Sequence, residues 1–223
     1  MLRKDPFITG QYYHLYNRGI DKKVIFNSEK DYKRFIILMY LANSNQSFRL
    51  DHIFDRENKV FHEIFDINRD EVIVSVGAWC LMPNHFHILI KQEVDGGITR
   101  FMKKLSTGYA MYFNKINERQ GSLFSGPFKS SLVGVDDNYM RQLFAYIHLN
   151  PLKLNFPDWK NNKNNLDKEE IKKLLDSYKY SSYQDYIEID RVEKKILNSD
   201  NFPDYFHEQH SFQRFVENYF ILS

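Results

Sequence analysis

Residues 71–92 constrain the fold more than any other part of this sequence. Apolar and β-branched residues dominate 71–82 and 85–92, and Met82-Pro83-Asn84 lies between the two runs. A proline between strands removes no hydrogen bond from a sheet. The pattern therefore predicts two neighbouring strands joined by a hairpin-like connection.

The flanking sequence predicts the remaining elements of one domain. A strand is expected over 11–17, followed by a helix from about 27 to 43. A second helix is expected from 98 to 116, with Gly121 as its stop, and extended chain or one more strand within 121–133. A third helix is expected from about 136 to 150. Residues 44–70 are interpreted as a long excursion. This order predicts an α+β, ferredoxin-like (split βαβ) fold, with an antiparallel sheet of about four to five strands backed by helices.

The C-terminal third predicts a helical extension. Pro151 disfavours helical geometry at Asn150, so the third helix is expected to end there. Further helices are expected at 167–178, 191–198 and 211–222. The chain is accordingly divided into a domain over 1–155 and a mainly helical extension over 156–223, packed on that domain or linked to it.

Composition excludes several classes of protein. The chain has 223 residues, 43% of them hydrophobic, which is enough for a sizeable core. No apolar run reaches the roughly 18 residues of a membrane helix, and no signal core follows the charged start, so a cytoplasmic location is expected. Cys80 is the only cysteine, which excludes an internal disulfide and a cysteine-cluster zinc site. The net charge of +2 does not by itself predict nucleic-acid binding.

Two histidines lie on one face of the second predicted strand of the hairpin. Side chains alternate along a strand, so His85 and His87 share a face, while Phe86 and Ile88 point the other way and suit packing under helices. The histidine face is therefore expected to be open. Two imidazoles on one face form a bidentate platform for a metal ion, although histidines in strands also serve as simple hydrogen-bonding residues.

The third predicted helix adds two polar residues that face together. Met140, Leu143, Phe144 and Ile147 form its buried stripe, and Tyr146 and Asn150 lie one turn apart on one flank. His148 projects about 200° from Tyr146, at about 100° per residue. It is expected to be a surface or packing histidine outside the Tyr146 cluster.

These motifs carry a resemblance to a known family. They are Met82-Pro83-Asn84 before His85-Phe86-His87, then Gly121-Ser122-Leu123-Phe124, Phe128-Lys129-Ser130, Tyr146 to Pro151, and Ser181-Ser182-Tyr183. The chain resembles the REP-associated tyrosine transposases, which are single-tyrosine HUH transposases of the IS200-like superfamily. The match extends from Tyr13 to about Tyr186.

The resemblance implies a chemistry for these residues. His85, His87 and the oxygen of Asn150 would hold Mg²⁺ or Mn²⁺, and Tyr146 would be the nucleophile that forms a 5′-phosphotyrosine bond. Residues 1–155 would then be the catalytic domain of a single-stranded DNA endonuclease and strand transferase that needs no nucleotide cofactor. Its partner would be single-stranded DNA with a hairpin, either REP-like or from a transposon end. The protein would be a monomer or a homodimer associated with the bacterial nucleoid.

Basic residues are the expected DNA contacts because they neutralise phosphates. They are Arg18, Arg100, Lys103, Lys104, Lys115, Arg119 and Lys129. From charge alone, a solvated helix face is the simpler interpretation of these residues. Pro127 departs from the family pattern, since relatives commonly carry arginine before Phe128-Lys129.

Three alternatives remain open from the sequence. Tyr139 lies on the same helix flank as Tyr146 and is the fallback nucleophile. The protein could also be a catalytically idle DNA-hairpin-binding regulator that keeps the fold. A metal-dependent nuclease that uses water in place of tyrosine is the third possibility.

Overall fold

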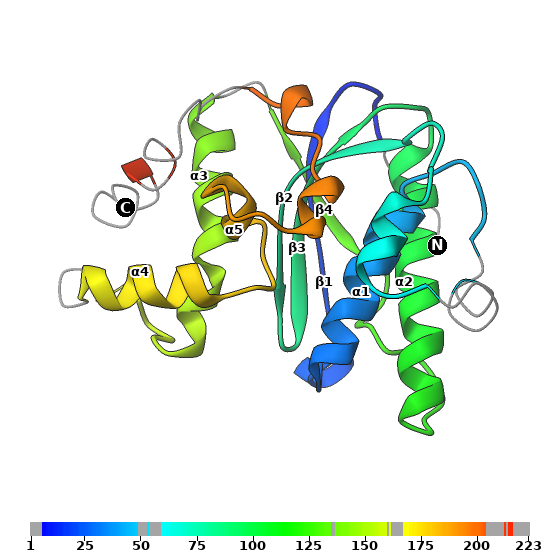
Figure 1. Ribbon diagram of the computed structural model, residues 1–223, viewed down its shortest axis with the longest axis horizontal. Helices are drawn as coiled ribbons and strands as arrows, with labels where there is room; N and C mark the ends of the chain where they lie inside the picture. Colours follow the sequence, from blue (N-terminus) through cyan, green and yellow to red (C-terminus); the bar gives the residue numbers. More distant parts are fainter. Residues whose placement is uncertain are drawn as a thin grey trace.

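A four-stranded antiparallel sheet forms the centre of the computed structural model, which describes residues 6–48, 53, 59–134, 137–159, 161, 167–203, 212, 214 and 215 (Figure 1). The strands are β1 (Tyr12–Arg18), β2 (Val74–Met82), β3 (His85–Gln92) and β4 (Lys129–Val133), in the order β2-β3-β1-β4. All neighbouring pairs are antiparallel. The ferredoxin-like prediction is confirmed, with four strands.

Helices α1 (Glu29–Ala42) and α2 (Gly97–Ile116) cover one face of the sheet. Their apolar residues pack with Phe86, Ile88 and Ile90 in the largest core cluster. A capping box between Ser28 and Asp31 starts α1 where the sequence predicted it. Helix α2 ends at Ile116, well before Gly121, and the side chain of Ile116 is 52% exposed.

Helix α3 (Asp137–Leu149) covers the opposite face of the sheet. Its predicted stripe is confirmed: Met140, Leu143, Phe144 and Ile147 are all buried, and they share a cluster with Leu89 of β3. The expectation that the histidine face is open is therefore wrong. Leu89 lies on the same face of β3 as the two histidines, and the apolar stripe of α3 packs on it.

The C-terminal segments are short. They are η4 (Asn150–Leu154), α4 (Lys168–Ser177), α5 (Tyr183–Tyr186), η6 (Val192–Ile196) and η7 (Ser199–Asn201), so the helix expected over 191–198 is a single 3₁₀ segment. Among the described residues, two further 3₁₀ segments, η1 (Ile20–Lys22) and η3 (His62–Asp66), lie nearer the N-terminus. Of the helix expected over 211–222, the structure describes only residues 212, 214 and 215.

Residues 180–182 line the free edge of β2. The Leu81 amide donates to the Tyr180 carbonyl at 2.8 Å, and the Ser182 amide donates to the Trp79 carbonyl at 2.9 Å. Cys80, buried as expected, forms an isolated bridge with Ser181. The extension thus supplies hydrogen-bond partners to backbone groups at the edge of β2 that would otherwise be unpaired. A domain boundary at residue 155 remains a prediction.

None of the helices within these described ranges is long and apolar enough to cross a membrane.

Candidate active site

Strand pairing brings the two histidines beside residues from β1. In the antiparallel register Tyr16 lies opposite His87, and Arg18 lies opposite His85. Directly opposed residues project from the same face of a sheet. His14, two residues before Tyr16, shares that face, and sequence reasoning missed it. The alternation of His14, Tyr16 and Arg18 was visible, but the position of this face beside the two histidines of β3 was not.

His87 is held by a second histidine. Its side chain is 6% exposed, and its Nδ1 lies 2.8 Å from Nε2 of His14. When His87 supplies the proton of this hydrogen bond, its Nε2 keeps a free lone pair. This arrangement is typical of metal-binding histidines, whose other ring nitrogen is fixed by a hydrogen bond.

His85 is oriented by the residue before it. Its Nδ1 lies 2.6 Å from Oδ1 of Asn84, and the Asn84 amide donates to the carbonyl of Lys22 at 3.1 Å. An amide oxygen only accepts, so the proton of His85 lies on Nδ1 and Nε2 is free. The Pro83-Asn84-His85 sequence therefore supplies a histidine together with its orienting group.

Burial keeps these imidazoles neutral. It lowers the pKa of His14 and that of His85 to about 4. The pKa of His87 falls well below its usual value, first through burial and then through the neighbouring His14. Neutral imidazole is the form that coordinates a metal, so at pH 7 both His85 and His87 are ready to do so.

Tyr146 reaches this pair from α3. Its half-buried ring meets the ring of His87 edge to face, with centroids 5.4 Å apart, and lies 6.2 Å from that of His14. Tyr146, His85 and His87 line one cavity of about 380 Å³. Tyr139 is 41% exposed and is absent from the described lining of this cavity.

Asn150 lies at the start of η4, one residue beyond α3, and is completely buried. Its Nδ2 donates to the Tyr146 carbonyl at 2.7 Å. Its Oδ1 accepts from Nζ of Lys153 at 2.8 Å. The structure thus brings His85, His87, Tyr146 and Asn150 together, and it adds Lys153, which sequence reasoning missed.

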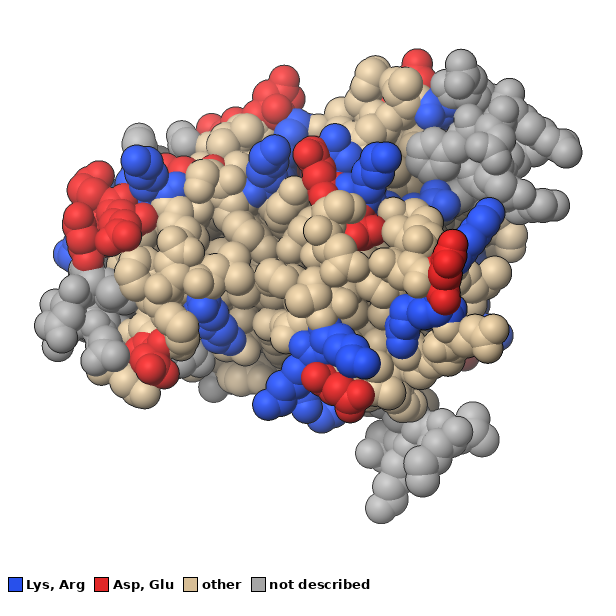
Figure 2. Space-filling view, turned by 90° about the horizontal axis from the view of Figure 1, so that it is seen from below, with Lys and Arg blue, Asp and Glu red and all other residues tan. Residues whose placement is uncertain are grey.

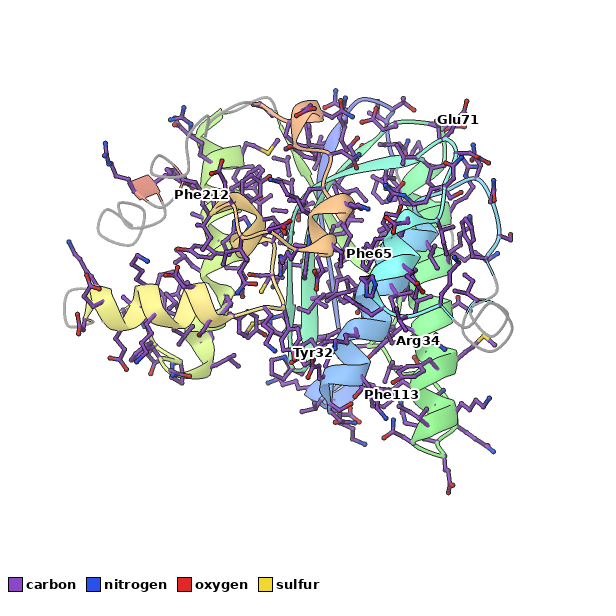
Figure 3. The ribbon with its side chains drawn as sticks, in the orientation of Figure 1. Tyr32, Arg34, Phe65, Glu71, Phe113 and Phe212 are labelled. Carbon is purple, nitrogen blue, oxygen red and sulfur yellow. The ribbon has the colours of Figure 1, made fainter. Side chains whose placement is uncertain are left out.

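His148 is separated from this site, as expected. It is completely buried, so its interpretation as a packing residue is right and the alternative of a surface residue is wrong. Its Nδ1 donates to the Phe144 carbonyl at 2.9 Å, and its Nε2 lies 2.7 Å from Oγ of Ser182. Phe212, labelled beside α3 in Figure 3, packs edge to face on its ring at 5.1 Å.

The basic residues expected to bind DNA do not lie on one surface. Arg18 and Lys129 line the histidine cavity, together with Lys22, which was not predicted. No Asp or Glu occurs in the described lining of that cavity. Figure 2 shows the end of the molecule that carries the β2–β3 connection, with Lys and Arg side chains spread across it.

Four of the other five residues lie on the side of the sheet that α1 and α2 cover. Arg100, Lys103, Lys104 and Lys115 line a groove of about 700 Å³ between α1 and α2. Arg34 of α1 also lines it and places its guanidinium 4.8 Å from the Tyr112 ring centroid (Figure 3).

Some of these cations already have structural partners. Lys104 donates to the carbonyls of Ser44 and Gln46, both at 2.6 Å, and thereby holds the chain after α1. Arg119 donates to the Ser122 carbonyl at 3.1 Å in the loop before β4. The structure therefore does not gather the seven predicted DNA contacts into one surface, and their role stays a prediction.

Comparisons with known proteins bear on the family and the fold of the chain. A search of curated proteins found no match. Among solved structures, the chain is similar to a REP-associated tyrosine transposase bound to a REP hairpin, with a TM-score of 0.50, 11% identity, and coverage of 86% of this chain and 90% of that chain.

A second solved structure is the tRNA(His) guanylyltransferase from Saccharomyces cerevisiae, with 12% identity and coverage of 93% and 85%. Its TM-score of 0.35 is too low to indicate a shared fold. The family model described as IS200-like transposase matches residues 37–150, which span α1 to α3 and include both histidines and Tyr146. The chain therefore belongs to the IS200-like transposase family.

Proposed function

We propose that this transposase is a metal-dependent single-stranded DNA endonuclease and strand transferase that cuts beside a DNA hairpin through a 5′-phosphotyrosine intermediate. The observation that carries the proposal is the meeting of His85, His87 and Tyr146 at one cavity, with Asn150 buried beside them. These residues come from a strand, a helix and a 3₁₀ segment that packing holds together.

The residues present fit a divalent metal ion. The free Nε2 atoms of His85 and His87 and the amide oxygen of Asn150 form a mixed nitrogen and oxygen donor set, which suits Mn²⁺ and is compatible with Mg²⁺. When bound there, the ion would polarise the scissile phosphate as a Lewis acid. The Asn150 oxygen would have to leave the Lys153 ammonium in order to join this set.

Tyr146 would perform the covalent step. Its Oη would attack the phosphorus, the bond from phosphorus to the 3′ oxygen would break, and the phenol proton would end on the released 3′-hydroxyl. The product is a 5′-phosphotyrosine bond. Since one phosphodiester replaces another, a 3′-hydroxyl can reverse the step and join strands without a nucleotide cofactor.

The charge around the site supports a nucleic-acid substrate. Arg18, Lys22 and Lys129 line the cavity with no described carboxylate among them, as expected for a surface that receives phosphates. The similar REP-associated transposase was solved with a hairpin bound, which supports a folded single strand as the substrate.

A denaturing gel tests the proposal. The protein would be incubated with single-stranded oligonucleotides that carry the hairpins flanking its own gene, with Mn²⁺, with Mg²⁺ or with EDTA. We expect a metal-dependent covalent adduct with the unaltered chain, no adduct with Tyr146→Phe, and a normal adduct with Tyr139→Phe as the matched control. An adduct that persists in Tyr146→Phe would overturn the assignment.

The same gel separates the alternatives. Cleaved DNA without an adduct would indicate a nuclease that uses water. Hairpin binding without cleavage under any metal condition would indicate a regulatory DNA-binding protein.

A further inference from the structure

Lys153 places a cation beside both the proposed nucleophile and the proposed third ligand. It projects from η4, and its Nζ lies 2.8 Å from Oδ1 of Asn150 and 5.1 Å from the centroid of the Tyr146 ring. Its charge also lowers the pKa of His85 and that of His87, after the larger effect of burial. Lys153 therefore lies next to Tyr146 and Asn150, outside the described lining of the cavity, whereas the exposed Arg18 and Lys129 belong to that lining.

This half-buried ammonium has no carboxylate partner among the described residues. Within the described part of the chain, its ammonium donates to a neutral amide oxygen, Oδ1 of Asn150. A cation removed from water without an opposite charge costs free energy, and an incoming anion offsets that cost. The nearby cavity lining is itself cationic, so the compensating charge must come from a ligand.

We propose that Lys153 binds a non-bridging oxygen of the scissile phosphate while Tyr146 attacks it. This inference rests on the proposed function and adds a phosphate-binding residue to it. A lysine ammonium is a compact charge on a flexible stem, so it can move from Asn150 to a phosphate within the same site. In that position it stabilises the negative charge that gathers on the phosphate oxygens during attack, and it keeps its proton throughout.

The geometry also gives a reason for Lys153 to move. The oxygen that now accepts from Lys153 is the one assigned to a metal ion, and two cations on one amide oxygen repel each other. Recruitment of Asn150 as a ligand would therefore release the ammonium toward the incoming phosphate. Lys153 is in this sense a catalytic residue, because it would touch the substrate.

The test measures the contact between Lys153 and one phosphate. Binding would be measured by fluorescence anisotropy in the Tyr146→Phe background with Mn²⁺, using the oligonucleotide that the unaltered chain cleaves. A second oligonucleotide would carry a neutral methylphosphonate at the cleaved position. We expect Lys153→Met to bind the normal strand about tenfold more weakly, as for a lost hydrogen bond to a charged group, and to bind the neutral strand as well as its parent does.

Three variants serve as controls. Lys173→Met removes an exposed lysine of α4 outside the cavity and should change neither affinity. Lys153→Arg should retain most of the affinity for the normal strand. Lys153→Gln keeps a donor without the charge, so it should repeat the loss and serves if the methionine variant folds poorly.

The outcomes distinguish this inference from the function on which it rests. If Lys153→Met and Lys153→Gln weaken both strands equally, or neither, Lys153 only supports Asn150 and the inference is wrong, while the adduct formed by the unaltered chain would still support the proposed function. If the unaltered chain forms no adduct with any hairpin, the proposed function and this inference fall together.

Discussion

Nδ1 of His87 on β3 lies 2.8 Å from Nε2 of His14 on β1, so one imidazole orients the other across a strand pair. A ring nitrogen occupied by this hydrogen bond is not available to a metal ion. In the proposed metal site, His87 would therefore coordinate through Nε2. We expect His14 to act as a positioning residue in that site, because it would fix the ring without joining the ligand set.

The first prediction concerns His14. His14→Phe keeps an aromatic ring in the sheet but removes the partner of His87 Nδ1. We expect the affinity for Mn²⁺ to fall by about 10- to 100-fold, as is usual when the group that orients a metal ligand is lost. Isothermal titration calorimetry would measure this change without any need for DNA.

A neighbouring aromatic residue provides the matched control. Tyr16→Phe alters a residue on the same strand face and leaves the bond between His14 and His87 in place. Its Mn²⁺ affinity should stay close to that of the unaltered chain. Unchanged affinity in His14→Phe would show that His87 needs no such support.

Ser182 is the subject of the second prediction, because it joins the C-terminal extension to both β2 and α3. Its Oγ accepts from the Trp79 amide at 2.9 Å and lies 2.7 Å from Nε2 of His148. Ser182→Ala leaves two buried polar groups without this partner. We expect the free energy of unfolding to fall by about 1 to 3 kcal/mol in urea titrations.

Ser177→Ala is the control for this change. The Ser177 hydroxyl is exposed and donates to the Leu174 carbonyl at 2.9 Å, a group that water can replace. Its stability should hardly change. If Ser182→Ala were as stable as Ser177→Ala, the extension would not depend on this hydrogen bond.

Local patterns predicted much of the fold and of the site. Alternation along a strand placed His85 and His87 on one face, and the period of the helix placed Tyr146 beside Asn150 and turned His148 away. These relationships depend only on residues close in sequence. The geometry confirms that these side chains meet, while their chemical roles remain proposals.

Relationships between distant segments were not predictable in the same way. His14 meets His87 because β1 lies beside β3, and neither residue carries a local signal of that pairing. The basic residues of α2 follow the histidines closely in sequence, yet α2 packs on the other face of the sheet. Lys153 lies beside Asn150 because the 3₁₀ segment η4 follows α3 directly. Pro151 predicted only that the helix ends at Asn150, and not that a 3₁₀ segment follows.

The third prediction compares a buried ion pair with an exposed one. Arg191 donates to both carboxylate oxygens of Asp185, at 2.7 and 2.6 Å, and to the Ser181 carbonyl. The Asp185 side chain is completely buried. Arg191→Met would leave this carboxylate without its partner, so we expect a loss of about 3 to 5 kcal/mol in the free energy of unfolding.

Lys195 and Asp66 form the matched exposed pair. Their atoms lie 2.5 Å apart, but the side chains are 50% and 67% exposed. Lys195→Met should therefore have little effect on the same urea curve, since water and salt screen such pairs. Equal effects of the two variants would contradict the role assigned to burial at Asp185.

The last prediction concerns acid stability. Burial lowers the pKa of His148 to about 3, and it lowers those of His14 and His85 to about 4, whereas an unfolded histidine titrates near pH 6.5. As the pH falls below about 6.5, these histidines bind protons in the unfolded chain but stay neutral in the folded chain. Unfolding is therefore favoured by acid, and stability is lost from about pH 6.5 downward.

Two histidine variants separate the contribution of His148 from the rest. Urea unfolding between pH 7.5 and 5 should show a free energy that falls with pH, by up to about 1.4 kcal/mol per pH unit for each excess proton bound by the unfolded chain. His148→Gln removes one such group, so its curve should fall less steeply. His62→Gln changes an exposed histidine and should keep the original slope. The comparison uses slopes, so a uniform loss of stability in His148→Gln does not affect it. Equal slopes in the two variants would show that His148 is protonated as easily in the folded chain as in the unfolded one.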